Sequence, residues 1–423
     1  MLGVRRKLQF LINLKSVVRV VVKLLLLLNL FMRYIYILFF SLVLSACSNG
    51  TKYNEEKFFE GELQSVKNVT IDSIKVETLN FETVESSFDG ILSVGGNTIN
   101  FIDRRFGWFF SFNNEGKLVS KKLGQGPGPS EINTGFIDAY AQLPNGKHIF
   151  IGSGYDVRIH DENFEREKTI FMQWYLKNKD SEITPDNLDP DMHRLYSPNY
   201  NNFNLQPLSD NLIYFPLDAN HKFFNRFSTK KYYEESRIIG ELNLETKKVE
   251  SLEGRKSREY LKHNYLTAYD VFDYQYSLKD EKTYVIFQPD SLVYVYNKKF
   301  KNLYSFGNKG KYIGNTSYVD FKGGYDIKEY RKYLVEKKSK TGYYTFIKYF
   351  EEDDLLFRTY NIANSEINDG LQIYKGNTLI ADVRVPNNFK VIGKIGDYYY
   401  SDVVTNEEEN YFKCYKFKLE NVK

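Results

Sequence analysis

Hydrophobic and polar positions alternate in short runs along most of this chain, and the clearest run covers residues 88–131. Four short apolar segments recur there, at residues 91–94, 98–103, 108–113 and 118–123, with Gly- or Asn-containing turns between them. Alternation with a period of two predicts strands, and Asn-Glu-Gly at residues 114–116 suits a hairpin turn because Asn and Gly tolerate positive φ. A meander of four strands cannot bury both of its faces alone, so the pattern predicts further copies of itself.

Five further units of this kind follow along the chain, with first hairpin turns near residues 146, 210, 280, 353 and 396. The spacing is uneven because polar insertions interrupt the repeat, above all at residues 172–202, 218–231 and 308–340. The last unit has three strands, and an additional strand is predicted at residues 68–81. The pattern therefore predicts an all-β, six-bladed β-propeller over residues 68–423, with its ring closed by an N-terminal strand that completes the last blade. Two β-sandwich domains are the alternative.

The first 46 residues have the composition of a secretory signal. They contain seven basic residues and no acidic residue, and an apolar run at residues 34–44 leads into Leu44-Ser45-Ala46-Cys47. This tetrapeptide resembles a bacterial lipobox, in which the cysteine is diacylated and becomes the mature N-terminus. We therefore predict lipid attachment at Cys47, a translation start at Met32 and a polar tether at residues 47–67. A retained membrane-spanning helix is the alternative.

The predicted signal in the first 46 residues also accounts for the apparent basicity of the chain, whose formal net charge is +4. Without its seven basic residues the remainder is slightly acidic, so nothing in the charge predicts nucleic acid as a partner. The chain has two cysteines. If Cys47 carries lipid, Cys414 has no disulfide partner, whereas a Cys47–Cys414 bridge would compete with lipidation.

A glycine-rich segment, KKLGQGPGPSE at residues 121–131, follows the strand-and-turn sequence IDRRFGWFFSFNNEGK. It resembles the link between blades in TolB-like six-bladed β-propeller lipoproteins of Gram-negative bacteria. The resemblance is specific in the first two units and weaker after residue 172, and Glu131 comes later than the family pattern places it. It implies a propeller anchored to the outer membrane of the cell envelope, facing the periplasm or the surface. These families are largely uncharacterised, so it implies little about function.

Recognisable catalytic and metal-binding motifs are missing from the sequence. The five histidines lack paired-ligand spacing, and the acidic segment 186–191 lacks the spacing of an EF-hand. The loop at residues 124–128 lacks the Lys-Ser/Thr pair of a phosphate-binding loop and is expected to be a structural link between blades. The sequence therefore predicts no catalytic residue, no metal site and no cofactor.

Propeller geometry gives a better indication of a binding site. The turns between second and third strands share one face with the links between blades, and long loops on one rim commonly form binding sites. Arg104, Arg105 and Trp174 are therefore the candidate ligand-binding residues, although Trp174 equally suits packing against a blade edge or the channel mouth.

The favoured function is a lipid-anchored envelope propeller that binds a partner protein, a peptide or a glycan. One alternative is a propeller enzyme, a lyase or hydrolase acting on polysaccharide or peptide in the central channel. A structural subunit of an envelope complex is another alternative. Carboxylates or histidines that converge inside the channel would favour the enzyme, whereas a broad apolar or aromatic rim would favour the binding protein.

Overall fold

The computed structural model describes residues 61–133, 135–174, 182–199, 203–227, 230–263, 266–319, 321 and 326–419. The chain divides into two units, Met1–Glu55 and Glu56–Lys423, and the described residues belong to the second. The predicted signal segment with Met32, and nearly all of the predicted tether with Cys47, lie outside the described residues. Within the described part, no helix has the length and apolarity needed to cross a membrane.

The first sheet is the antiparallel meander that its sequence predicts. Its strands are β4 (Gly90–Gly95), β5 (Thr98–Asp103), β6 (Trp108–Phe112) and β7 (Leu118–Leu123). The side-chain oxygen of Asn113 holds the last turn by accepting hydrogen bonds from the N–H groups of Glu115 and Lys117, at 3.0 and 2.9 Å. Gly116 completes this turn with a φ of 82°, and a Cβ atom there would approach the carbonyl oxygen of Asn80 to 2.2 Å.

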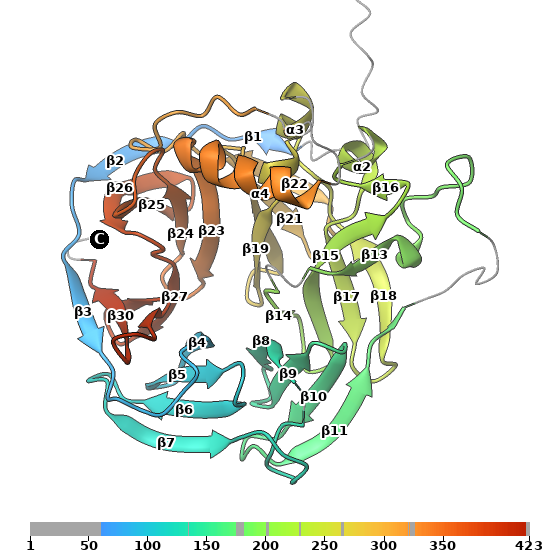
Figure 1. Ribbon diagram of the computed structural model, residues 1–423. Helices are drawn as coiled ribbons and strands as arrows, with labels where there is room; N and C mark the ends of the chain where they lie inside the picture. Colours follow the sequence, from blue (N-terminus) through green and yellow to red (C-terminus); the bar gives the residue numbers. More distant parts are fainter. Residues whose placement is uncertain are drawn as a thin grey trace, which may run out of the picture. The chain divides into compact units, whose positions relative to one another are not determined.

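Five more sheets follow in chain order, and Figure 1 shows all of them arranged around a common centre. The second contains β8 (Ile137–Gln142), β9 (His148–Gly152), β10 (Asp156–His160) and β11 (Arg166–Phe171). The third contains β12 (Gln173–Trp174), β13 (Tyr196–Pro198), β14 (Gln206–Pro207), β15 (Leu212–His221), β16 (Phe224–Asn225), β17 (Ile239–Asn243) and β18 (Lys248–Glu253).

The remaining sheets are built from the second half of the chain. The fourth contains β19 (Phe272–Ser277), β20 (Lys282–Phe287), β21 (Val293–Asn297) and β22 (Asn302–Phe306). The fifth contains β23 (Tyr343–Phe350), β24 (Leu355–Asn361), β25 (Asn368–Lys375) and β26 (Thr378–Pro386). The last contains β27 (Val391–Ile395), β28 (Tyr398–Ser401), β29 (Val404–Asn406) and β30 (Tyr411–Phe417).

The fold is an all-β propeller, as predicted, but the predicted number of six blades is wrong: the strands form six sheets, and the propeller has five blades. The last sheet departs from the regular meander: its strand order is β27-β28-β30-β29, and β28 faces β30 over only two residue pairs. Directly after β28 the N–H of Asp402 donates to the Lys390 carbonyl at 2.7 Å, which extends the pairing with β27 by one residue. The Ser401 hydroxyl in turn accepts from the N–H of Tyr415 at 2.9 Å, so the interrupted strand resumes only as β29.

The single strand predicted at residues 68–81 is divided into two, and a shorter strand precedes it. β1 (Glu62–Leu63) and β2 (Lys67–Ile71) pair in parallel with β22 and β26. β3 (Val76–Asn80) pairs antiparallel with β30, so the N-terminal segment does contribute a strand to the last sheet. Residues 62–80, which we call the N-terminal belt, thus cover the outer edges of three successive sheets (Figure 1).

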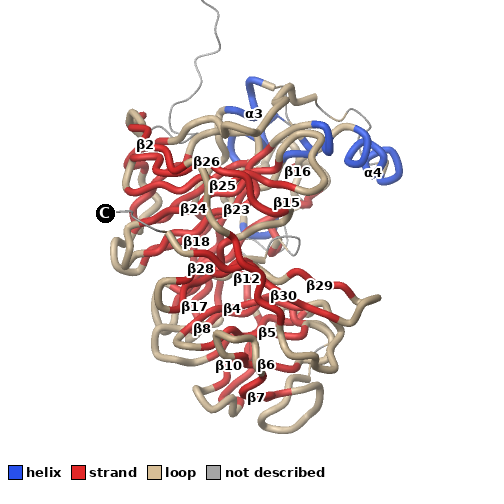
Figure 2. The backbone as a smooth tube through the Cα atoms, turned by 90° about the vertical axis from the view of Figure 1, so that its left-hand side faces the viewer, coloured by secondary structure: helices blue, strands red, loops and turns tan. Residues whose placement is uncertain are grey.

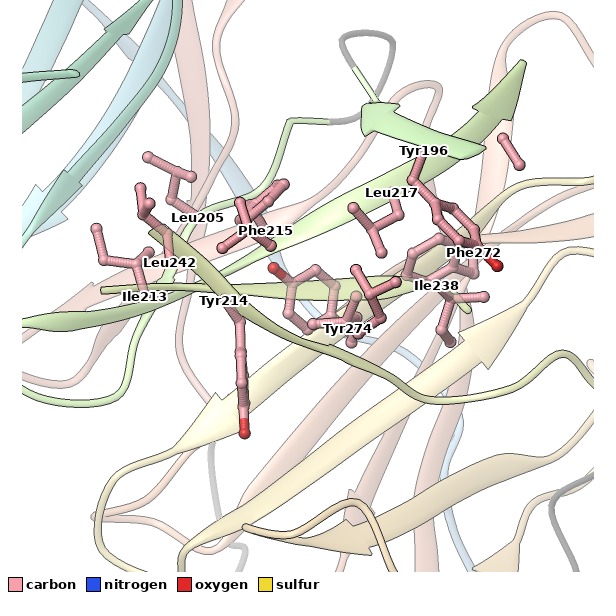
Figure 3. Close-up of a cluster of buried hydrophobic side chains, with 14 of the residues drawn as sticks. Tyr196, Leu205, Ile213, Tyr214, Phe215, Leu217, Ile238, Leu242, Phe272 and Tyr274 are labelled. Atoms are coloured by element: carbon pink, nitrogen blue, oxygen red, sulfur yellow. The ribbon is translucent and has the colours of Figure 1, made fainter. Parts of the chain in front are cut away.

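Hydrophobic side chains fill the spaces between neighbouring sheets. The largest cluster joins the second, third and fourth sheets, and many of its members are aromatic. Figure 3 shows part of it, where Tyr214, Phe215 and Tyr274 are all fully buried. Full burial of one such side chain contributes about 1.5–3 kcal/mol, so much of the chain's abundant Tyr and Phe serves packing between sheets.

A buried arginine joins the fourth and fifth sheets. Arg358 in β24 is completely buried, and its guanidinium lies 4.2 Å above the ring of Tyr344. It donates to the carbonyl oxygens of Ser291 and Asn308 at 2.6 and 2.8 Å and, through Nε, to Oε1 of Gln372 at 3.0 Å. The planar guanidinium therefore fixes the turn between β20 and β21 against the neighbouring sheet.

The insertions carry the helices, which Figure 2 shows gathered at one side of the molecule. They are α2 (Lys230–Glu235), α3 (Glu259–Lys262) and α4 (Ile327–Glu336). Asp326 caps α4, because its side chain accepts from the N–H groups of Lys328 and Glu329. The predicted insertion at residues 172–202 contributes β12 and β13 to the third sheet, so part of it is sheet rather than loop.

We expect the N-terminal belt to determine the stability of the ring. A chain that begins at residue 67 loses only β1 and should melt close to the intact protein. A chain that begins at residue 82 also loses β2 and β3, exposes the edges of β26 and β30, and loses the buried side chains of Leu79 and Phe81. This loss should approach the ~5–15 kcal/mol that keeps a domain folded. Thermal melts of the two truncations test the prediction, and equal melting temperatures would contradict it.

Candidate functional site

A cavity of about 720 Å³ lies where the innermost strands of all the sheets meet. Its walls come from β4, β8, β14, β19, β23 and β27 and the residues next to them, and we call it the central channel. The volume is within the range of roughly 300–1,000 Å³ that is usual for ligand pockets. Its described lining includes these charged side chains: Arg104, Asp138, Asp273, Lys348, Glu351, Lys390 and Asp402.

Arg104 lies at one end of the channel, between the first two sheets. Its Nε donates to the Ile137 carbonyl at 2.8 Å, and its guanidinium lies 4.3 Å above the ring of Phe136. The same guanidinium forms ion pairs with Asp138 at 3.4 Å and with Asp89 at 3.6 Å. These contacts fix the side chain, and the two carboxylates balance its charge.

One wall of the channel is a chain of side-chain hydrogen bonds. Gln275 donates to Gln206 at 2.7 Å, Gln206 donates to Asn204 at 2.6 Å, and Asn204 donates to Asp273 at 3.2 Å. Asp273 also accepts from the N–H of Ile347 at 2.9 Å, which links β19 to β23. Because these amides hold one another, the wall is rigid before any ligand arrives.

Several channel groups have pKa values displaced by burial. Burial raises the pKa of Asp273, and the nearby Lys390 partly opposes this rise. Burial likewise raises the pKa of Asp402, again with partial opposition from Lys390. Burial lowers the pKa of Lys348, and the carboxylate of Asp273 works in the opposite direction. Displaced pKa values that cluster in one cavity are typical of functional sites.

Two of the channel cations lack a direct counter-ion. Among the described residues, neither Lys348 nor Lys390 has an oxygen of Asp or Glu within 4.0 Å of its ammonium, whereas Arg104 has two such partners. Lys390 instead lies 5.9 Å from the centre of the Phe346 ring. These two ammoniums therefore lack a close ion pair in a lining that also contains four carboxylates, those of Asp138, Asp273, Glu351 and Asp402.

The structure places the three residues singled out in the sequence at different sites. Arg104 lines the channel. Arg105 is 60% exposed beside it and forms an ion pair with Asp89 at 3.6 Å. Trp174 is in β12, which pairs with the outermost strand β18, and its indole packs edge to face on Phe215 with ring centres 6.0 Å apart. Trp174 thus lies at a blade edge, where the alternative interpretation of the sequence put it.

The sequence pattern did not single out the channel residues Asp273, Lys348, Lys390 and Asp402. A signal existed for two of them: Asp273 and Lys348 are charged residues inside apolar first strands, VFDYQY and TFIKYF. The first strand of each unit is the innermost one in a propeller, so a charge within it is a candidate channel residue. Lys390 and Asp402 flank short strands, where a charge is unremarkable in the sequence.

Two of the histidines and the glycine-rich loop make contacts within the fold itself. His148 and His160 face each other across β9 and β10, and burial lowers the pKa of each to about 4. No group of three or more potential metal ligands occurs within the described ranges. In the loop, the carboxylate of Glu131 accepts from the N–H of Gly128 at 2.7 Å, so the chain's own anion occupies the glycine loop. Cys414 is a buried free cysteine.

Comparison with known proteins identifies the fold. No protein-family model and no curated protein matches the chain. A solved structure of a DUF4221 family member from Bacteroides vulgatus is 13% identical, with a TM-score of 0.58, over 82% of this chain and 99% of that one. A putative exported protein from Bacteroides fragilis is 12% identical, with a TM-score of 0.47, over 84% of this chain and 100% of that one. At this level of identity the likeness to the Bacteroides vulgatus protein supports the propeller fold alone, and membership of a TolB-like family is not established.

The surroundings of Trp174 predict how its replacement acts. Trp174→Ala should lower the free energy of unfolding by about 2 kcal/mol or more, because the indole packs on Phe215 in the sheet interface. Trp174→Phe should keep most of the stability. Arg105→Ala, at an exposed side chain, is the control and should change it by less than about 0.5 kcal/mol. Denaturant titration measures all three, and a Trp174→Ala variant as stable as the parent would return Trp174 to the ligand-binding candidates.

Proposed function

We propose that this protein is a lipid-anchored, outer-membrane propeller of the cell envelope whose central channel binds a polar ligand, a peptide or a glycan. The observation that carries the proposal is the channel itself: a cavity of about 720 Å³ with a hydrogen-bonded amide wall, fixed Arg104 and two lysines without close counter-ions. Preorganised polar groups in a cavity of this volume are what a small-molecule site requires. The lipobox-like sequence at residues 44–47 and the TolB-like segment at residues 121–131 support the envelope address.

The anchor is tested at the cysteine that would carry it. Cys47→Ser should abolish incorporation of labelled palmitate and move the protein from the membrane fraction to the soluble fraction, because a serine hydroxyl cannot form the thioether. Cys414→Ala removes the other cysteine, which is buried, and should leave labelling unchanged. Labelling that persists in Cys47→Ser and disappears in Cys414→Ala would refute the anchor.

The binding site is tested by blocking the channel. Ser93 in β4 lines it, so Ser93→Trp should fill part of the cavity and weaken capture of peptides or glycans from arrays at least tenfold. Ser120→Trp is the matched control, because Ser120 lies in the outermost strand β7 of the same sheet. Equal capture by both variants, at equal melting temperature, would place the site outside the channel.

The enzyme remains a second candidate, because Asp273 and Lys348 have displaced pKa values in the same cavity. A carboxyl with a raised pKa can act as a general acid, and an amine with a lowered pKa can act as a general base. Mass spectrometry of the ligand recovered from the binding experiment separates the two functions. Recovery of unchanged ligand identifies a binding protein, whereas a product that Asp273→Asn no longer forms identifies an enzyme.

A further inference from the structure

The outer strands of the sheets differ in whether a further strand covers them. In the described part of the chain, β22, β26, β30 and β18 each pair with a strand from elsewhere in the sequence, namely β1, β2, β3 and β12. Three of these added strands, β1, β2 and β12, run parallel to the strand that they cover. β7 and β11 have no such partner there, and Figure 1 shows them following one another along the outer rim. The fold therefore adds extended segments to its outer strands repeatedly and leaves two neighbouring outer strands open.

The two open strands have the length and the exposure that strand addition needs. β7 and β11 contain six residues each, whereas the strands that the chain adds to its other edges contain two to five. Val119 in β7 and Phe171 at the end of β11 are 61% and 63% exposed. Unpaired main-chain groups beside exposed apolar side chains are what an added strand uses, because the main chain supplies hydrogen bonds and the side chains supply specificity.

Other parts of the chain already reach the start of each open strand. The N–H of Leu118 donates to a carboxylate oxygen of Glu82 at 3.0 Å, and the N–H of Arg166 donates to the Pro129 carbonyl at 2.9 Å. Both hydrogen bonds leave the sheet, so the donors on this side of the strands are accessible. Across the described ranges, no other main-chain group from outside the two sheets bonds to β7 or β11. The rest of each edge is therefore open to a further segment.

The charge of the two strands favours an acidic segment. Together β7 and β11 contain four basic residues and one acidic residue. The acidic residue, Glu167, already forms an ion pair with Lys147 at 2.6 Å. Lys121, Lys122 and Lys168 are exposed, and within the part of the chain that the structure describes none of them has a carboxylate oxygen within 4.0 Å. Carboxylates on an added strand would compensate these charges.

The turns before the two strands are acidic, which confines the positive charge to the middle and end of each strand. Glu115 forms an ion pair with Lys117 at 3.5 Å, and Asp161 accepts from the N–H groups of Asn163 and Glu165. A second copy of this chain is a poor occupant, because pairing of two β7 strands would place lysines close to lysines, and like charges on paired strands are destabilising. The matching occupant is a different chain that carries carboxylates.

We propose that β7 and β11 bind an extended acidic segment of a partner protein, which adds one strand to each of the first two sheets. The carboxylates of the segment lie near Lys121, Lys122 and Lys168, and its apolar side chains cover Val119 and Phe171. The belt shows the length required, because its first two strands, β1 and β2, cover two successive sheets within about ten residues. This surface lies on the outer rim, so the inference goes beyond the proposed channel function and does not rest on it.

Three blocked dodecapeptides test the main-chain pairing and the charge separately. The full chain, purified in detergent, is titrated by fluorescence anisotropy with a labelled peptide of alternating Glu and Val. The second peptide has Lys in place of Glu. The third keeps the Glu-Val sequence but has N-methyl groups on both of its edges, which remove main-chain donors and leave the charge unchanged. We expect the Glu-Val peptide to bind at least tenfold more tightly than either of the others, and to protect amides of β7 and β11 from hydrogen exchange.

Charge-reversed variants locate the site on the rim. Lys121→Glu combined with Lys168→Glu should weaken binding of the Glu-Val peptide at least tenfold and strengthen binding of the Lys-Val peptide. Lys299→Glu, at an exposed lysine in the turn between β21 and β22, is the control and should leave both affinities unchanged. Ser93→Trp should also leave them unchanged, because it fills the channel and not the rim. Melting temperatures of all variants show whether a loss of binding reflects a loss of structure.

Four results would overturn the inference. They are equal affinity for the Glu-Val and N-methylated peptides, equal affinity for the Glu-Val and Lys-Val peptides, full affinity in the charge-reversed variant, and no binding of the Glu-Val peptide up to the millimolar range. Binding that Ser93→Trp abolishes and that charge reversal does not weaken would place the peptide in the channel. That outcome would support the proposed channel function and remove the rim site.

Discussion

The unpaired hydrogen-bonding groups at the outer edge of each sheet are the constraint on which the rest of this structure depends. A free edge strand is a template for pairing with another chain, so each edge needs protection. The N-terminal belt pairs with β22, β26 and β30, and β12 pairs with β18. The first two sheets have no such added strand in the described structure, but charged residues cover their edges: Lys121 and Lys122 in β7, and Arg166, Glu167 and Lys168 in β11.

The belt also determines how the sheets act together. A single segment of about 20 residues contacts three successive sheets, so none of the three can separate without breaking main-chain pairing. Arg358 adds a second connection between the fourth and fifth sheets, inside the ring rather than at its edge. Both connections also stabilise the channel, because its wall strands β14, β19, β23 and β27 belong to four different sheets. A binding site shared between sheets has defined geometry only when their relative positions are fixed.

The local sequence pattern was sufficient to predict most strands. It was insufficient where contacts between residues far apart in the chain determine the structure. Strands β4 to β11 follow the alternation closely, because residues such as Asn113 and Gly116 define their turns locally. The irregular last sheet depends on the hydrogen bond from the N–H of Tyr415 to the hydroxyl of Ser401, which no local pattern reveals. Arg104 was predicted as a candidate because it lies in the turn between the second and third strands, and the position of this turn specifies a face of the propeller. Lys348 and Lys390 were missed because they become neighbours of one cavity only when the ring closes.

The order in which the belt and its partners occur in the chain has a consequence for biosynthesis. The belt is synthesised first, but β22, β26 and β30 end only at Phe306, Pro386 and Phe417. These contacts span most of the chain, and such long-range pairing slows folding. The early segment must therefore remain unpaired while most of the remaining sheets are made. A chain terminated before Phe417 would keep part of its belt exposed. Only a complete chain can close the ring, and an incomplete chain stays accessible to proteases.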